Sequence, residues 1–435
     1  MKNRKRNEEE ALKSEELALS LDAADPLAVW KEQFHQIPGK IYLVGNSLGL
    51  LCRRAEENLL QALEEWKRLA IDGWSQAARP WINLAEETGA AVAELVGAEP
   101  EELVMTASTT INIHALLASF YRPRPGRSRI LSESLAFPSD LYALAGQIKM
   151  RGLNPDHELL LIQGREEQLS EDEIIAAMGP DIALVFLPSV LYRGGQLLDM
   201  PRLAAAANER GIPIGFDCSH SAGVVPHRLS AWGVDFAVFC SYKYLNGGPG
   251  APAFLYLNRR HFRTEPLLAG WFGSQKERMF AMEPVFTPAQ AAAGWQISSP
   301  AILAAASLAG SLKLIKQAGI AEIRSKSLRL TSFMRELLEQ IECPEEQVFA
   351  IKTPLPDRNR GGHLALSFAE RTWNVCAALK KRGVIADFRP PDLLRLAPAP
   401  LYNSFHEVFL VVSRLQEVLE AREDLENIPR TGIVT

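Results

Sequence analysis

The sequence is poor in cysteine, and its few cysteines are arranged neither as metal ligands nor as a disulfide framework. Its 435 residues include five cysteines, an odd number without any CxxC pair. Disulfide-rich secreted domains and zinc modules show paired, closely spaced cysteines. We therefore expect free thiols, no bound metal and a cytoplasmic location. The cysteines are Cys52, Cys218, Cys240, Cys343 and Cys376.

The chain also lacks a basic excess and long apolar runs. Its net charge of -5 argues against a nucleic-acid partner, which would need a strongly basic surface. No apolar stretch approaches the ~18–20 residues of a membrane helix, and residues 1–16 lack the apolar core of a signal peptide. The 47% hydrophobic and 23% charged residues are typical of a globular protein. We therefore expect about two or three packed units and no membrane partner.

Residues 51–306 alternate helical periodicity with short apolar runs, which is typical of a large α/β domain. Helical spacing is clear in residues 55–70, 111–120 and 200–211. Near-continuous apolar strands between helices indicate a mainly parallel sheet with helices on both faces. The seven expected strands are residues 102–108, 129–133, 159–163, 182–188, 212–217, 236–240 and 253–257.

The pattern changes after a long expected helix over residues 307–319. Residues 307–435 then predict a smaller α+β domain. Residues 1–50 contain no strand–helix unit of their own, and we expect them to pack on this smaller domain. The expected strands of the small domain are residues 363–368 and 384–388, and its further helices are residues 374–383 and 404–421.

A lysine directly after an apolar strand is the strongest functional motif. The segment CSYKYLNGGPG, residues 240–250, places Lys243 between an expected strand and a glycine-rich turn. Ligands of open α/β sheets bind outside the carboxyl ends of the strands. The amine of Lys243 is therefore expected at a binding site, although the motif alone is equally compatible with a surface lysine.

A carboxylate at the end of the preceding strand gives Lys243 a chemical context. Asp217 ends the expected strand 212–217, and His220 follows in the next turn. A carboxylate at this position can hold the pyridine nitrogen of pyridoxal phosphate (PLP) protonated, so that the cofactor acts as an electron sink. Taken alone, Asp217 is also a good helix N-cap, and His220 is an ordinary turn residue.

Hydroxyl side chains precede a helix nearer the N-terminus. Residues 106–110, TASTT, lead into the expected helix 111–120. Hydroxyls and free backbone N–H groups at a helix start bind anions, here the phosphate of PLP. Without the other two motifs, this segment would indicate a capped helix and nothing more.

These three motifs occur in the order found in PLP enzymes of the aspartate aminotransferase fold (fold type I), and the chain resembles the kynureninases among them. The resemblance runs from near position 45 to beyond 400. It implies PLP as cofactor and hydrolysis of L-kynurenine to anthranilate and L-alanine, in tryptophan catabolism or NAD synthesis. The matching stretches are residues 45–49, 79–81, 137–140, 195–196, 216–217, 241–250, 270–273, 297–298 with Pro300, and 400–406.

The resemblance also implies a role for individual residues. Lys243 binds the cofactor aldehyde and serves as the catalytic base, while Tyr242 contacts the phosphate and supplies protons. Arg395 binds the α-carboxylate of the substrate, for which its planar fork is suited; by itself it would indicate a surface salt bridge. Further cofactor contacts are Thr109, Thr110, Phe137, Asp140, Asp217 and His220, with Trp271 and Ser299 from the partner subunit of a homodimer with shared active sites. Further substrate contacts are Asn46, Ser47 and Trp74.

Two of these positions bear on substrate choice. In relatives that prefer 3-hydroxykynurenine, the resemblance implies His and Asn at the positions of Trp74 and Ser299, facing the aniline ring. An indole and a short hydroxyl would leave an added ring hydroxyl poorly paired. We therefore expect L-kynurenine to be preferred, whereas Trp74 taken alone indicates an ordinary packing residue.

Two other classes of function remain open from the sequence. A class V aminotransferase or a cysteine desulfurase would share the fold, but a desulfurase needs a mobile, accessible cysteine. Cys376 lies in a helix-like segment, and Cys343 is harder to exclude. A non-catalytic protein of this fold would be expected to lack Lys243 or Asp217, and both are present.

Overall fold

The computed structural model describes residues 14–341, 348–426 and 429. Its largest sheet has seven strands in the order β2-β8-β7-β6-β5-β3-β4, all parallel except β8, which is antiparallel to both of its neighbours. The strands are β2 (Leu103–Met105), β3 (Arg129–Glu133), β4 (Leu159–Ile162), β5 (Ile182–Pro188), β6 (Ile214–Asp217), β7 (Phe236–Phe239) and β8 (Phe254–Leu257).

Every one of these strands lies within a segment expected from the sequence. The apolar runs identified them because both faces of the sheet are covered, so successive side chains are buried on alternate sides. Val185 and Phe239 pack on the face covered by α9, whereas Phe186 and Val238 pack on the face covered by α5 and α6. The prediction of a mainly parallel, helix-flanked α/β sheet is confirmed.

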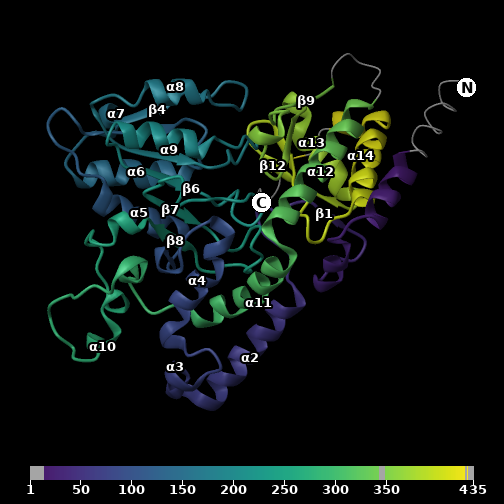
Figure 1. Ribbon diagram of the computed structural model, residues 1–435. Coiled ribbons are helices and arrows are strands. Elements are labelled where there is room, and N and C mark those ends of the chain that lie inside the picture. The colour runs from purple at the N-terminus through teal and green to yellow at the C-terminus, as the bar shows by residue number, and fades with distance from the viewer. Residues whose placement is uncertain (1–13, 342–347, 427–428, 430–435) are drawn as a thin grey trace, which may run out of the picture.

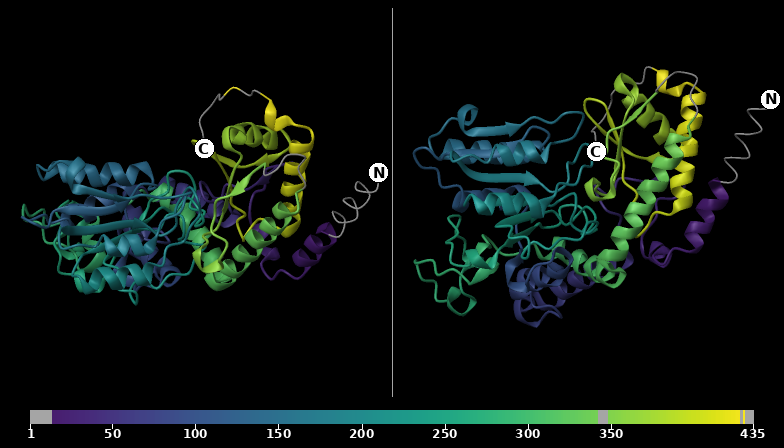
Figure 2. Two further views of the ribbon diagram at one scale, coloured as in Figure 1. Left: turned by 90° about the horizontal axis from the view of Figure 1, so that it is seen from above. Right: turned by 45° about the horizontal axis from the view of Figure 1, so that its top comes forward.

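Helices cover both faces of this sheet and form the large body with it (Figure 1). Helices also make up most of a second, smaller body. Figure 2 shows the two bodies side by side from two further directions, with α14 and residues 14–23, which are helical, on the small body. The helices are α2 (Arg53–Leu69), α3 (Gly73–Gln76), α4 (Leu84–Val96), α5 (Thr109–Phe120), α6 (Pro138–Met150), α7 (Pro155–Glu158), α8 (Glu171–Ala176), α9 (Met200–Glu209), α10 (Lys276–Met279), α11 (Ile302–Ala318), α12 (Ile320–Glu339), α13 (Thr372–Lys381) and α14 (Phe405–Glu420).

The small body is built on an antiparallel sheet of four strands in the order β12-β13-β10-β9. Leu394 and Leu396 of one strand face a core formed with α12 and α14. Because side chains alternate along a strand, Arg395 faces the other way, and it contacts the large body. The strands are β9 (Ala350–Ile351), β10 (Leu364–Ser367), β12 (Asp387–Arg389) and β13 (Leu393–Leu396).

The single strand expected over residues 384–388 is wrong in one respect, because the chain forms two strands there. β11 (Val384–Ile385) pairs in parallel with β1 (Ile41–Tyr42), whereas β12 joins the four-stranded sheet. Ala386 separates them, so adjacent residues contribute to different sheets. An apolar run in a sequence reports burial, not the identity of the pairing strand.

The segment before α2 touches both bodies. β1 pairs with β11, and the Asp22 carboxylate accepts hydrogen bonds from the backbone N–H groups of Phe405 and His406 at the start of α14. Further along, the N–H of Gly49 donates to the carbonyl of Tyr242 at 2.8 Å, beside Lys243. A Cβ at Gly49 would overlap the Lys243 carbonyl and the Asn246 side chain, so only glycine allows this approach.

Candidate active site

Two buried carboxyl groups meet at the carboxyl end of β6. Asp217 ends this strand, and Asp140, in the first turn of α6, is hydrogen-bonded to it. Burial first, and then the negative charge of Asp217, raises the pKa of Asp140 well above its ordinary value, while the charge of Lys243 opposes this shift. Asp140 is therefore the member of the pair that holds a proton more readily.

A third carboxyl group lies at the end of β3. Burial raises the pKa of Glu133 to about 8, and its carboxylate accepts a hydrogen bond from the N–H of Leu135. Its charge also contributes to the raised pKa of Asp140. Glu133 thus shapes the loop that leads to Phe137, and this role was not expected from the sequence.

Lys243 and His220 lie near the Asp140–Asp217 pair. His220 is 8% exposed, and its Nδ1 is buried without a hydrogen-bond partner. Burial, then the charges of Lys243 and Arg395, lowers the pKa of His220 well below its ordinary value. The imidazole is therefore neutral at physiological pH. The structure brings Lys243 near both Asp217 and Asp140 on one side and His220 on the other.

The start of α5 leaves polar groups without partners. Ser108 occupies the N-cap position but does not cap the helix with its side chain, and Thr109 Oγ1 is buried without a partner. Thr110 Oγ1 lies 2.6 Å from Ser139 Oγ at the start of α6. Two helix starts and their hydroxyls thus adjoin, which is suited to binding a phosphate.

Aromatic side chains border the same region. Phe137 is 46% exposed and meets the ring of Tyr192 edge-on, with ring centroids 5.3 Å apart. Tyr192 in turn lies 6.3 Å from the His220 ring. An exposed phenyl ring beside these polar groups offers a surface on which a flat heterocycle can stack.

Tyr242 is half-buried next to Lys243. Burial, and then its contact with Cys240, raises the pKa of the Tyr242 hydroxyl. The phenol is therefore protonated at neutral pH and can donate a proton. In the neighbouring loop, Ser189 Oγ donates to the Asp217 carbonyl at 3.1 Å and lies 2.6 Å from Ser221 Oγ, so this hydroxyl is already engaged below the site.

Arg395 enters the site from the small body. It is 1% exposed, its Nη1 donates to the carbonyl of Tyr192 at 2.6 Å, and its Nη2 pairs with Asp387. Its Nε is buried and has no partner. The guanidinium is therefore held at the boundary of the two bodies with one donor free.

Asn46 and Ser47 approach from the segment before α2. Asn46 is fully buried, yet neither its amide nitrogen nor its amide oxygen has a partner. Ser47 Oγ accepts a hydrogen bond from Arg389 Nη2 at 3.2 Å. Because an unpaired buried amide costs about 1–3 kcal/mol, its presence indicates a ligand group that would satisfy it.

Three polar residues of this region, two buried and one half-buried, were not identified from the sequence. Asp387 and Arg389 lie on β12, and His363 immediately precedes β10. Burial lowers the pKa of His363 to about 3, with a further contribution from Arg395. The only signal available was the alternation of charged and apolar residues in 387–389, which a short amphipathic strand also shows.

Trp271, Ser299 and Trp74 lie apart from this group. Trp271 is 47% exposed and donates its Nε1–H to the Met279 carbonyl at 2.9 Å; Ser299 is also exposed. Trp74 contacts Phe272 at 5.6 Å between ring centroids. In the described part of the chain, no hydrogen bond or ring contact joins these three residues to Lys243. Figure 1 shows α10, next to Trp271, on the side of the sheet away from the small body.

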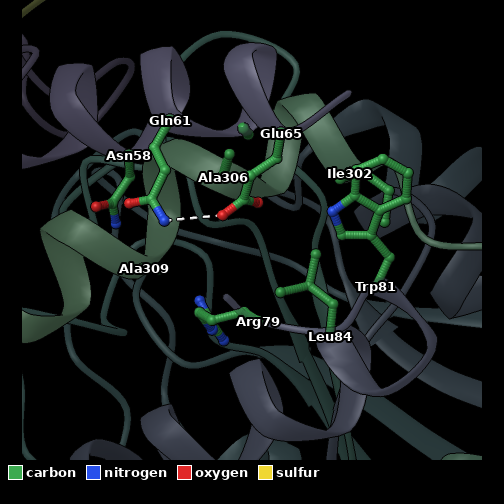
Figure 3. Close-up of a pocket in the computed structure, with 10 residues that line it drawn as sticks. Asn58, Gln61, Glu65, Arg79, Trp81, Leu84, Ile302, Ala306 and Ala309 are labelled. Atoms are coloured by element: carbon green, nitrogen blue, oxygen red, sulfur yellow. Dashed lines mark hydrogen bonds between the residues drawn. The ribbon is translucent and has the colours of Figure 1, made fainter. Parts of the chain in front are cut away.

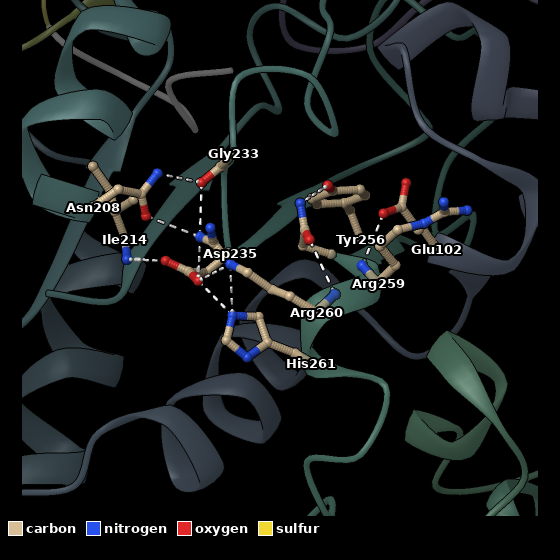
Figure 4. A network of polar contacts seen from close by, with 10 residues as sticks. Glu102, Asn208, Ile214, Gly233, Asp235, Tyr256, Arg259, Arg260 and His261 are labelled. Atoms are coloured by element: carbon tan, nitrogen blue, oxygen red, sulfur yellow. Dashed lines mark hydrogen bonds and ion pairs between the residues drawn. The ribbon is translucent and has the colours of Figure 1, made fainter. Parts of the chain in front are cut away.

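At the amino ends of the central strands, a buried aspartate has all of its hydrogen-bond partners within the chain. Asp235, which precedes β7, accepts hydrogen bonds from the Ile214 N–H at 2.8 Å and from Arg260 Nε at 2.9 Å, and it pairs with His261 (Figure 4). This network is complete within the chain. It therefore reads as structural, in contrast to the unpaired Asn46, His220 and Thr109.

A separate small pocket lies beside α2 and α11. Figure 3 shows Gln61 donating to Glu65 at 2.8 Å on one wall, with Arg79 and Trp81 on the other. None of the site residues named above lines it. The stretch 79–81, which carried part of the resemblance, thus supports packing around α2.

The cysteines do not supply a desulfurase nucleophile in the described residues. Cys376 lies on α13, where burial raises the pKa of its thiol to about 12. Cys52, Cys218 and Cys240 are buried free thiols, and Cys343 lies outside the described residues. Within the described ranges, no group of three or more His, Cys, Asp or Glu side chains could hold a metal ion, and none of the helices has the length and apolar character needed to cross a membrane.

Solved structures with the same fold include a cysteine desulfurase and a cystine C-S lyase. A cysteine desulfurase from Thermococcus onnurineus NA1 superposes with a TM-score of 0.76 at 19% identity, covering 91% of this chain and 98% of that one. A mutant of the cystine C-S lyase C-DES with glycine covalently linked to its PLP gives a TM-score of 0.77 at 18% identity, covering 89% and 99%. At this identity the likeness establishes the fold alone.

Sequence relatives are far closer. A family model described as the kynureninase C-terminal domain matches residues 323–415. Curated kynureninases from Geobacillus thermodenitrificans and Bacillus anthracis are 48% and 50% identical over 409 residues, which is 94% of this chain and 95% of each relative. Such identity over nearly the whole length shows that the chain belongs to the kynureninase family.

Proposed function

We propose that the protein is a PLP-dependent hydrolase that cleaves the Cβ–Cγ bond of L-kynurenine, giving anthranilate and L-alanine. The observation that carries the proposal is the grouping of Lys243, the Asp140–Asp217 pair and His220 at the carboxyl ends of parallel strands, with Arg395 reaching in from the small body. Kynureninases about 50% identical over nearly the full length support the choice of substrate.

The residues present fit PLP. Thr109 Oγ1 at the start of α5 is an unpartnered buried hydroxyl suited to the phosphate, and Phe137 offers an exposed ring face. The Asp140–Asp217 pair matches a protonated ring nitrogen, and Lys243 is the amine of this cluster. When bound, PLP supplies an electron sink for the charge that develops at Cα.

The side chains then divide the work of the reaction. The Lys243 amine removes the Cα proton of the substrate and later returns protons to the reacting carbon atoms. Asp217, backed by Asp140, keeps the ring nitrogen protonated, because a carboxylate beside a cation stabilises the charged form. Water consumed in the cleavage would supply the hydroxyl of the anthranilate carboxyl group. The proton that the three-carbon fragment takes up to leave as L-alanine would pass through Tyr242, whose phenol is protonated. Arg395 binds the α-carboxylate and thereby orients the bond to be broken.

We include in the proposal a homodimer with shared active sites. Trp271 and Ser299 are exposed, and Trp74 lies in the same aromatic group as Trp271 through Phe272. A partner subunit could present these side chains to the substrate ring. The exposed aromatic group is suited to an interface, where Trp and Phe are enriched. The buried free thiols accord with the proposed cytoplasmic location.

The activity is tested by adding L-kynurenine to PLP-loaded protein and following anthranilate fluorescence, with L-alanine quantified separately. Lys243→Ala should abolish turnover without unfolding the chain, because the amine is not part of the core. The matched control is Lys381→Ala, which removes an exposed amine that pairs with Glu426 at the end of α13. Wild-type protein that retains PLP but releases no anthranilate would overturn the proposal.

A further inference from the structure

Two arginines and one aspartate face each other on the small sheet. Asp387 of β12 stands directly opposite Arg395 of β13 in the antiparallel register. Arg389 lies two residues after Asp387, so both side chains leave the same face of β12. The register thus brings two guanidiniums to one carboxylate at the boundary with the large body.

The contacts within this group leave one positive charge unmatched. Asp387 Oδ2 accepts from Arg395 Nη2 and from Arg389 Nη2, the latter at 3.1 Å, and both partners' Nε atoms are buried without an acceptor. Burial lowers the pKa of Arg395; the charge of Asp387 opposes this shift, and the charge of Arg389 adds to it. Two guanidiniums that share one carboxylate therefore repel each other. A second anion between them would relieve this repulsion.

The arginine pair and Lys243 lie near the same buried histidine, His220. The charges of Lys243, Arg395 and Arg389 all contribute to lowering the pKa of the buried His220. Arg389 also donates to Ser47, whose neighbour Asn46 has an unpartnered amide. The proposed substrate carries a single carboxylate, at Cα. One anionic group is thus available for the one unmatched positive charge.

We infer that Arg389 is a second substrate-binding arginine, and that Asp387 is a positioning residue that holds Arg389 and Arg395 around one α-carboxylate. The inference rests on the proposed function and adds to it. A carboxylate bound by a single guanidinium can still rotate about its bond to Cα. A carboxylate bound by two guanidiniums cannot. The substituents of Cα are then fixed relative to Lys243 and the cofactor.

Binding of L-alanine to PLP-loaded protein, measured by calorimetry, tests this inference without turnover of kynurenine. L-Alanine has the α-amine and the α-carboxylate, whereas L-alaninamide has the amine and no carboxylate. Arg389→Met should weaken L-alanine binding by about 10- to 100-fold, the range expected for charge-assisted hydrogen bonds, and should change L-alaninamide binding by less than about twofold. Arg389→Lys, which keeps the charge but loses the fork, should show a smaller loss.

The matched control is Arg382→Met, which removes an arginine that pairs with Glu417 and Glu423 at the end of α13. It should leave both affinities unchanged. Asp387→Asn should weaken L-alanine binding and should leave L-alaninamide binding unchanged. Equal losses for both ligands in Arg389→Lys, or no loss for L-alanine in Arg389→Met, would overturn the inference. Wild-type protein that binds L-alanine but releases no anthranilate would instead contradict the proposed function.

Discussion

Complementation between one inactive and one impaired chain gives the sharpest test of the shared active site. Lys243→Ala removes the reactive amine of one subunit, and Trp271→Ala removes the side chain that this subunit is proposed to lend to its partner. Each homodimer carries two damaged sites. We expect Trp271→Ala to cost ~2 kcal/mol or more, about 30-fold in kcat/KM, as for a truncated aromatic anchor. Lys243→Ala should be inactive.

The hybrid dimer carries one intact site and one doubly damaged site. The Trp271→Ala chain keeps Lys243, and the Lys243→Ala chain supplies Trp271 to it. Because a twofold dimer has two equivalent sites, the purified hybrid should show about half of the wild-type turnover per dimer. Differently tagged chains can be co-expressed, isolated by successive affinity steps and assayed for anthranilate release.

A matched pair shows whether recovery depends on which residue comes from which chain. Asp217 lies in the same cluster as Lys243 of its own chain, so a hybrid of Lys243→Ala with Asp217→Ala has no intact site and should stay inactive. If the Lys243→Ala and Trp271→Ala hybrid is no more active than its two parents, Trp271 acts within its own subunit. A fully active monomer in sedimentation would refute the shared site as well.

Three further predictions concern single features of the site. Arg395→Lys should raise KM for L-kynurenine markedly while leaving the cofactor absorbance unchanged; altered PLP binding with normal KM would place Arg395 on the wrong ligand. Wild-type protein should have a higher kcat/KM for L-kynurenine than for 3-hydroxy-L-kynurenine. The double variant Trp74→His, Ser299→Asn should narrow this difference in kcat/KM or reverse it. Equal kcat/KM values for the two substrates in the wild type would contradict the expectation. Because the folded-state pKa of Glu133 is raised to about 8, its contribution to the free energy of unfolding is present below pH ~4.5 and is lost at up to ~1.4 kcal/mol per pH unit until pH 8. Glu133→Gln should remove this decline, and denaturant unfolding at several pH values would reveal whether it persists.

The sequence predicted the large sheet well because most of its strands are buried on both faces. A run such as residues 182–188 is apolar throughout, and it forms β5 with the same bounds. The same reasoning placed Asp217 and Lys243 at neighbouring strand ends, since carboxyl ends of parallel strands share one edge of a sheet. The grouping of these two residues thus followed from local pattern and from general rules of topology.

The small body was harder to predict because its strands are short and its polar residues are buried by tertiary contacts. Leu394 and Leu396 indicate burial, but nothing local shows that Asp387 stands opposite Arg395. That register depends on which strands pair, and so does the position of Arg389. The raised pKa of Glu133 is equally invisible in the sequence, because it arises from burial by distant segments.

The pairing of β1 with β11 bears on how the chain is made. Ile41 stands opposite Val384 and donates its N–H to the Gly383 carbonyl, yet a ribosome must synthesise most of the protein between them. During translation, the side chains of Ile41 and Leu43 stay exposed until the core residues that pack on them, such as Leu396, have been synthesised. Gly49, which contacts Tyr242, is fixed in place by the same segment. The candidate active site around Lys243 can therefore form fully only after β11 has left the ribosome. A chain stopped before residue 384 would expose an apolar edge that invites association with other unfinished chains.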